Sequence, residues 1–258
     1  MDVKQAEFLV NGYVTFENLL PVEKIDRLHE AFMALLNQVR DRETEIQPRD
    51  RGDLRTGKGR MQLENRYTMY WPLDPPFADP ELYENPVILD FLEQYWGTDD
   101  FFISCLHSNT PYPGSSMQKW HRDTILLTPG VGNQRHPHFG VKIPLVDTTE
   151  ENGSFELYPC SQYVAEAAYE GEYDDILARG DFPHARRLNL KRGTMWVQDP
   201  RALHRGTPNR SDHARPELCI CYSLSWFRVP NQVELYRESF EGLSERGKKL
   251  FTDARLLD

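Results

Sequence analysis

Short β-rich runs separated by turn signals fill the second half of the chain and restrict its fold more than any other feature. Pro-Gly pairs, an Asn-Gly pair and single glycines separate the runs FFISCLH, WHRDTILL, FGVKIPLV, GSFELY, TMWVQ and ELCICYSLSWF. Many short strands separated in this way are typical of antiparallel sandwiches and jelly rolls. We therefore predict a β-rich core over about residues 98–230.

Helical patterns flank this core. After Pro21, apolar residues recur at spacings of three and four, which predicts an amphipathic helix. Residues 79–97 predict two short helices, and about 231–251 predict a C-terminal helix. We expect a mainly β protein with flanking helices, built as one domain over residues 1–258 with a helical N-terminal buttress over about 1–97.

Two stretches show no hydrophobic period, and we expect them to shape a binding pocket. Residues 42–66 read as a loop that is rich in arginine, either a solvated surface loop or a flap over a polar substrate. Residues 163–187 belong to an insertion, about 160–190, that we expect to be partly helical.

The net charge of −10 disfavours nucleic acids and anionic membranes as partners. No run approaches the ~18 consecutive apolar residues of a membrane span, and the first residues lack a signal-peptide pattern. The four cysteines include no CxxC pair, and Cys219 and Cys221 share one face of a predicted strand. We expect buried free thiols rather than a disulfide or a soft-metal site, in a soluble cytoplasmic protein.

Two histidines and an aspartate are the residues most able to carry chemistry. His121 and Asp123 lie two apart at the start of a predicted strand, so both can point to one face while Arg122 points away. His204 follows the run TMWVQ, and a jelly roll can bring such distant strands together. Two imidazoles and one carboxylate form the facial triad that binds non-haem Fe(II). Taken alone, the first pair also fits a surface ion pair, and His204 also fits a loop histidine.

Arg215 follows His204 by eleven residues and opens the last β-rich run. Its planar guanidinium can hold a carboxylate through two parallel hydrogen bonds, although a surface arginine fits the pattern as well. A second spaced pair, His136 and His138, brackets a proline and is expected to lie in a loop. No GxSxG, P-loop or GxGxxG motif occurs, so nothing indicates a serine hydrolase, an NTPase or a dinucleotide enzyme.

Three segments resemble the phytanoyl-CoA dioxygenase-like family of iron(II)- and 2-oxoglutarate-dependent oxygenases. Residues 204–215 (HRGTPNRSDHAR) are similar to the family's distal-histidine block, and residues 113–123 are similar to its proximal block. Residues 152–162 resemble a third family stretch, in which Cys160 and Gln162 replace the usual glycine and histidine.

The resemblance implies a double-stranded β-helix, or jelly roll, in which three residues bind Fe(II): His121, Asp123 and His204. It also implies that Arg215 binds the distal carboxylate of 2-oxoglutarate. Gln118 and Thr207 are expected to contact this co-substrate or to support the site, with Thr207 one residue beyond the family's usual hydroxyl position, which is Gly206 here.

The implied activity is that of a dioxygenase that uses dioxygen, decarboxylates 2-oxoglutarate to succinate and CO2, and hydroxylates a small-molecule substrate. Asp123 favours this outcome, because halogenases of the superfamily carry glycine or alanine at that position. The same machinery can instead drive desaturation, cyclisation, epimerisation or demethylation. A non-catalytic metal-binding jelly-roll protein and a cupin-like metal enzyme that uses no 2-oxo acid are the alternatives. The sequence identifies neither the substrate nor the oligomeric state.

Overall fold

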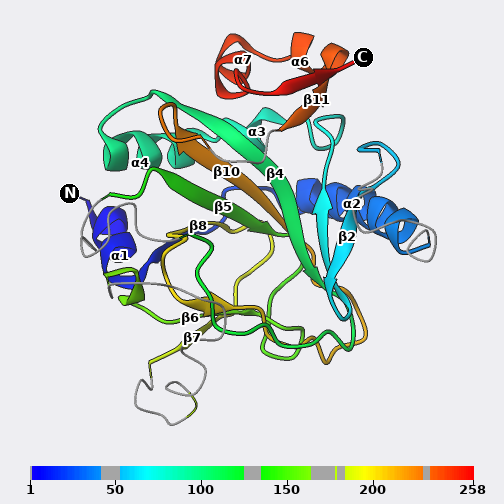
Figure 1. Cartoon of the computed structure of the whole chain (residues 1–258), viewed down its shortest axis with the longest axis vertical. Coiled ribbons are helices and arrows are strands. Elements are labelled where there is room, and N and C mark those ends of the chain that lie inside the picture. Colours follow the sequence, from blue (N-terminus) through cyan, green and yellow to red (C-terminus); the bar gives the residue numbers. More distant parts are fainter. Residues whose placement is uncertain (1, 42–52, 125–134, 164–177, 179–183, 229–232) are drawn as a thin grey trace.

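A seven-stranded antiparallel sheet forms the centre of the computed structural model, which describes residues 2–41, 53–124, 135–163, 178, 184–228 and 233–258 (Figure 1). Across this main sheet the strands are β1 (Tyr13–Phe16), β8 (Met195–Gln198), β5 (His138–Pro144), β10 (Glu217–Leu224), β4 (Phe101–Pro111), β3 (Arg66–Tyr70) and β2 (Lys58–Leu63). A second sheet contains β7 (Arg186–Leu188), β6 (Phe155–Leu157) and β9 (His204–Arg205).

The two sheets pack face to face through a small apolar cluster. Phe155 of β6 meets Trp196 of β8 edge to face, with ring centroids 5.1 Å apart. Leu157, Leu188 and Ala202 belong to the same cluster. The result is an open sandwich, as the pattern of short strands predicts.

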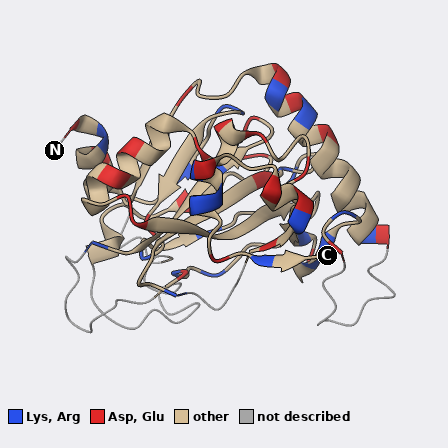
Figure 2. Ribbon diagram, turned by 90° about the horizontal axis from the view of Figure 1, so that it is seen from above, with Lys and Arg blue, Asp and Glu red and all other residues tan. Residues whose placement is uncertain are grey.

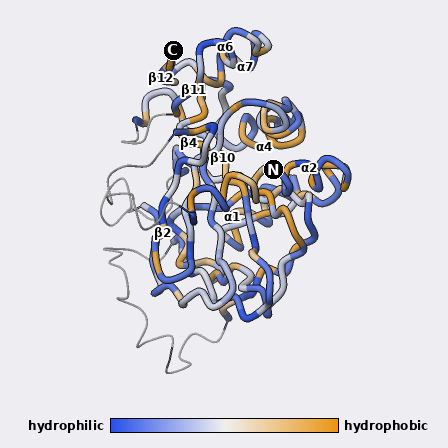
Figure 3. Tube along the Cα trace, turned by 90° about the vertical axis from the view of Figure 1, so that its right-hand side faces the viewer, coloured by the Kyte–Doolittle hydropathy of each residue, from blue (hydrophilic) through white to orange (hydrophobic). Residues whose placement is uncertain are grey.

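Helices cover the other face of the main sheet (Figure 3). They are α1 (Val3–Asn11), α2 (Val22–Asp41), α3 (Pro80–Tyr83) and α4 (Pro86–Trp96). Alternate side chains of β8 point to opposite faces of the main sheet. Met195 and Val197 pack in the large core under the helices, whereas Trp196 packs in the cluster between the two sheets. At β8 the main sheet is therefore covered on both faces.

Local sequence signals explain these helices. The predicted apolar stripe of α2 is buried along its length. Asp79 and Asn85 cap α3 and α4 by accepting a backbone hydrogen bond from two residues onward, and a proline opens each helix. Gly12 ends α1 in the left-handed conformation, with φ 76°, and so turns the chain into β1.

Charged residues of both signs are intermixed along the outer helices (Figure 2). Within the described residues, no helix combines the length and the apolarity needed to cross a bilayer.

Two element predictions in the middle of the chain are wrong. Residues 58–63, inside the predicted loop 42–66, form β2, because β3 supplies its backbone partners. The run WHRDTILL contains no strand in its described part, where His121 forms only an isolated bridge to His204. Most of the insertion 160–190 lies outside the described residues.

The predicted C-terminal helix over 231–251 is also wrong. The described part of this segment forms a strand and two short helices, β11 (Glu234–Tyr236), α6 (Arg237–Glu241) and α7 (Glu245–Leu250). The chain leaves α6 at Gly242, and the Ser244 hydroxyl caps the start of α7. β11 pairs in parallel with β12 (Arg255–Leu257).

The protein should lose stability on acidification because of His136. This side chain precedes β5, as predicted, but it is buried with 1% exposure, and burial lowers its pKa from 6.5 to about 4. Between these pH values the unfolded chain binds a proton that the folded chain does not. His136 should therefore contribute a decrease of ~3 kcal/mol to the free energy of unfolding as the pH falls from about 6.5 to about 4, and the buried His138 acts in the same direction.

Urea denaturation at about pH 7 and about pH 4.5 measures this effect, since both values lie near the limits of the window. His136→Gln should depend less on pH than the wild type, whereas His213→Gln, at an exposed histidine, should not differ from it. Equal pH dependence in all three proteins would contradict the assignment to His136.

Candidate active site

Backbone pairing holds His121 and His204 together. In their isolated antiparallel bridge, each N–H donates to the carbonyl of the other residue at 3.0 Å. Opposite residues of an antiparallel pair project to the same side, and the two imidazole centroids lie 4.4 Å apart. The structure thus brings together two histidines that are distant in the sequence.

Asp123 lies against the same pair. Its backbone N–H donates to the Pro200 carbonyl at 2.9 Å. Its Oδ1 lies 3.4 Å from His204 Nε2 and 3.8 Å from His121 Nε2. Around an octahedral metal with bonds of ~2.1 Å, adjacent ligand atoms lie about 3 Å apart. Small movements of the three side chains toward one another would therefore place their ligand atoms around one ion.

Hydrogen bonds orient both imidazoles. His121 Nδ1 lies 2.8 Å from the Lys119 carbonyl, and His204 Nδ1 lies 2.8 Å from the Ala202 carbonyl. At His121 the carbonyl can only accept, which favours a proton on Nδ1 and a free lone pair on Nε2. His204 Nδ1 also lies 3.0 Å from Gln198 Nε2, so its two neighbours fix the orientation of the ring and not the position of its proton. Phe155 stacks on His204 with ring centroids 4.9 Å apart, which restricts rotation of this imidazole.

The Asp123 carboxyl group is ionised. Desolvation alone would raise its pKa, but the charge and hydrogen bond of His204, with Lys142 and His121, hold the pKa well below its ordinary value. These interactions belong to the metal-free site. With a metal in place of the protons, two neutral imidazoles and one carboxylate would suit Fe(II), and such a facial set leaves further positions on the metal for other ligands.

Arg215 is buried, but it already faces a carboxylate. Its Nη1 lies 3.5 Å from Glu217 Oε2, which also accepts a hydrogen bond from Trp196 Nε1 at 3.3 Å. The Nε of Arg215 is buried and makes no hydrogen bond to the described residues. This long contact and the unbonded Nε leave the guanidinium with donors for a second carboxylate.

Gln118 and Thr207 shape the backbone beside the histidines. Gln118 Oε1 accepts from the Gly206 N–H at 2.7 Å. The Thr207 hydroxyl donates to the Ser154 carbonyl at 2.8 Å and accepts from Arg187 Nη2 at 2.6 Å. Both side chains therefore support the segment that follows His204, and neither lines the cavity described below.

Sequence reasoning assigned Arg66 to a charged loop, but its side chain is buried at this site. It donates to the carbonyls of Ser116 at 3.1 Å and Thr207 at 2.8 Å. Burial, together with the positive charge of Arg215, lowers its pKa to about 9. The clue in the sequence was the apolar strand that begins at this residue.

A cavity of about 440 Å³ extends from Asp123 across the main sheet, and its wall includes Gln198, Lys142, His107, Cys219 and Cys221. Lys142 of β5 is a buried cation in this wall, and sequence reasoning missed it. Its Nζ donates to Gln198 Oε1 and lies 4.2 Å and 4.7 Å from the ring centroids of Phe155 and Trp196. No carboxylate of the described residues forms an ion pair with it.

Solved structures of other proteins share this fold. AviO1 from Streptomyces viridochromogenes Tue57 is 17% identical, with TM-score 0.61, over 88% of this chain and 96% of that chain. HygX from Streptomyces hygroscopicus, solved with nickel, 2-oxoglutarate and hygromycin B bound, is 15% identical, with TM-score 0.60, over 91% of each chain.

EctD from S. alaskensis, solved with 2-oxoglutarate and 5-hydroxyectoine, is 18% identical, with TM-score 0.62, over 89% of this chain and 78% of that chain. Identities this low establish the shared fold alone. They confirm the prediction of a mainly β, jelly-roll protein with flanking helices.

The family follows from the sequence itself. The profile of the family described as phytanoyl-CoA dioxygenase (PhyH) matches residues 8–216, a span that contains the three clustered residues and Arg215. The match covers most of the 258 residues and agrees with the resemblance seen in the motifs. The chain belongs to the phytanoyl-CoA dioxygenase family.

Proposed function

We propose that this protein is an Fe(II)- and 2-oxoglutarate-dependent dioxygenase that hydroxylates a small molecule. The convergence of His121, Asp123 and His204 beside the cavity carries the proposal. Such a facial triad leaves room on one metal for a bidentate co-substrate and for dioxygen. Two structures with the same fold contain 2-oxoglutarate, and one of them also contains a metal.

In this proposal the side chains hold and orient the reactants. The Nε2 atoms of His121 and His204 and the carboxylate of Asp123 bind the metal, and the polar neighbours of the Nδ1 atoms hold both imidazoles in position. With Fe(II) and 2-oxoglutarate bound, the site supplies an oxidant, and 2-oxoglutarate ends as succinate and CO2. The Phe155 and Trp196 rings keep water away from the inner side of His204.

We infer that buried cations hold the distal carboxylate of 2-oxoglutarate. Arg215 and Lys142 are both buried, and Glu217 lies beside Arg215. The carboxylate that interacts with Lys142 is Asp123, and in this proposal it is bound to the metal. The Trp196 ring lies under Lys142, and its Nε1 bonds to Glu217, so these groups are contiguous. An unbalanced buried charge is unfavourable, and an anionic co-substrate would balance it. In this scheme Gln118 and Thr207 position the backbone near the co-substrate.

The polar residues in the cavity wall favour a polar organic molecule as the substrate. Strands β2, β3 and β4 contribute Gln62, Thr68, Tyr70 and Asn109, all of which can form hydrogen bonds. A cavity of about 440 Å³ suits a small molecule. Hydroxylation would add an oxygen atom to it, whereas desaturation or cyclisation would remove hydrogen, so the product mass distinguishes these outcomes.

Anaerobic addition of Fe(II) and 2-oxoglutarate tests the proposal. We expect a visible charge-transfer band that requires both components and that candidate substrates perturb. After oxygen is admitted, succinate should form, which a non-catalytic metal-binding protein would not produce. Asp123→Ala should lose the band and the succinate. Wild-type protein that binds Fe(II) without the band or succinate formation would refute the proposal.

A further inference from the structure

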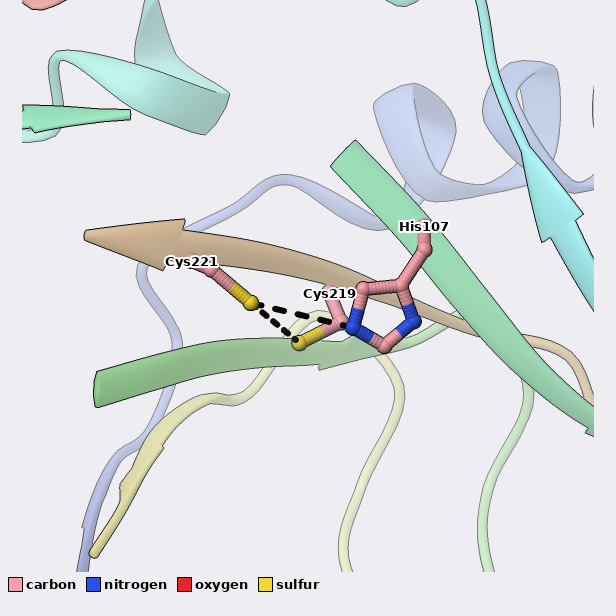
Figure 4. A group of neighbouring side chains, drawn as sticks. All are labelled: His107, Cys219 and Cys221. Carbon is pink, nitrogen blue, oxygen red and sulfur yellow. Dashed lines mark hydrogen bonds between the residues drawn. The ribbon is translucent and has the colours of Figure 1, made fainter. Parts of the chain in front are cut away.

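A second group of metal-binding side chains lies in the wall of the same cavity. His107 of β4 and Cys219 and Cys221 of β10 point toward one another (Figure 4), with one ligand atom from each within 4.8 Å of the others. Cys219 lies opposite His107 in the β4–β10 pair, and Cys221 is two residues further on the same face. The group is built on two central strands of the main sheet, which are rigid elements.

Two of the three distances between these ligand atoms match a tetrahedral metal site. Cys219 Sγ lies 3.9 Å from Cys221 Sγ, and Cys221 Sγ lies 3.7 Å from His107 Nε2. Around Zn²⁺, with Zn–S of about 2.3 Å and Zn–N of about 2.05 Å, tetrahedral geometry separates two sulfurs by ~3.8 Å and a sulfur from a nitrogen by ~3.6 Å. The two measured distances agree with these values within about 0.2 Å. A disulfide would require a sulfur–sulfur distance of about 2 Å.

The surroundings leave room for this group. Gly140 of β5 lies opposite Cys221, and a Cβ at this glycine would come 3.2 Å from Cys219 Sγ. All three side chains line the cavity, and both cysteines are buried. A hydrogen bond with Cys221 and burial raise the pKa of Cys219, whereas a hydrogen bond with Cys105 and burial raise the pKa of Cys221.

We propose that His107, Cys219 and Cys221 form a binding site for Zn²⁺, with a fourth position that faces the cavity. Two thiolates balance the charge of a divalent ion in a buried wall. Thiolate ligands favour Zn²⁺, whereas the imidazole and carboxylate set of His121, Asp123 and His204 suits Fe(II). The fourth position would hold water or a donor atom of the molecule in the cavity, as in zinc sites with three protein ligands. Binding would release two protons from the thiols.

Titration with Co²⁺, a spectroscopic substitute for Zn²⁺, tests the site in metal-free full-length His121→Ala protein, in which the other cluster is weakened. We expect one equivalent of Co²⁺ to produce thiolate charge-transfer bands that Zn²⁺ then removes. Cys219→Ser and Cys221→Ser, each in the same background, should lose these bands. Cys160→Ser, at an exposed cysteine away from the cavity, should retain them. Bands that survive both of the first two substitutions would overturn the assignment.

X-ray absorption at the zinc edge needs no cysteine variant. It therefore tests the site even if the serine variants fail to fold. The Zn²⁺-loaded His121→Ala protein should show sulfur neighbours at ~2.3 Å together with nitrogen or oxygen neighbours. A shell of nitrogen and oxygen alone would overturn the proposal. Either result is independent of the Fe(II) and 2-oxoglutarate band of the wild type, so the two proposals fail separately.

Discussion

His204→Ala should lower succinate formation by more than ~100-fold, because removing a residue that merely orients a metal ligand already costs 10–100-fold in metal affinity or activity. His204 also contacts Asp123 and the stacked Phe155 ring, so its loss removes one ligand and loosens another. Fe(II) affinity under anaerobic conditions and succinate formation under air are the two measurements.

His213→Ala is the matched control for this substitution. His213 is exposed, and its Nδ1 lies 3.0 Å from the carboxylate of the adjacent Asp212. It should therefore match the wild type in Fe(II) affinity and in turnover. Turnover at the wild-type rate by His204→Ala would contradict the assignment of the metal site to these three residues.

Lys142→Met should raise the KM for 2-oxoglutarate by about 10- to 100-fold, because a buried, hydrogen-bonded partner of a charged group contributes a few kcal/mol to binding. The substitution leaves no carboxylate of the described residues without its ion-pair partner. It does remove the donor of the buried Gln198 Oε1, so stability should fall by about 1–3 kcal/mol. Lys191→Met, at a lysine whose side chain is 83% exposed, is the control and should keep the wild-type KM.

Arg215→Met should raise the same KM and also destabilise the protein by about 3–5 kcal/mol, because it leaves a buried carboxylate unpaired. That carboxylate is Glu217, which is 3% exposed. Urea denaturation of Arg215→Met and of Arg215→Met/Glu217→Gln separates the two effects, since the double variant should regain stability without regaining affinity. An unchanged KM in both Lys142→Met and Arg215→Met would show that neither residue binds 2-oxoglutarate.

The features that sequence reasoning predicted well are those encoded locally or in motifs. The buried stripe of α2 repeats at helical spacing, and the proline and asparagine signals around residues 79–97 mark the two short helices. His121, Asp123 and His204 were predicted as a group from their motifs, and the structure brings them together. Their role as metal ligands is a prediction, which the Fe(II) affinity of His204→Ala tests.

Features that depend on partners distant in the sequence were missed. The direction of Lys142 is one example, because the last four residues of β5 are all buried and alternation gives no signal there. Arg66 is another, since its burial comes from carbonyls at Ser116 and Thr207. The edge strand β2 exists through its pairing with β3. None of these interactions is visible as a period in the local sequence.

The backbone bridge between His121 and His204 links ligand geometry to local opening of the structure. Any fluctuation that breaks its two hydrogen bonds separates both imidazoles at once, so a metal that requires both ligands opposes the fluctuation by its own binding free energy. Amide hydrogen exchange at these two positions would then slow in proportion to metal occupancy. The protein would thus tighten the edge of its smaller sheet, at β9, when it is loaded for reaction.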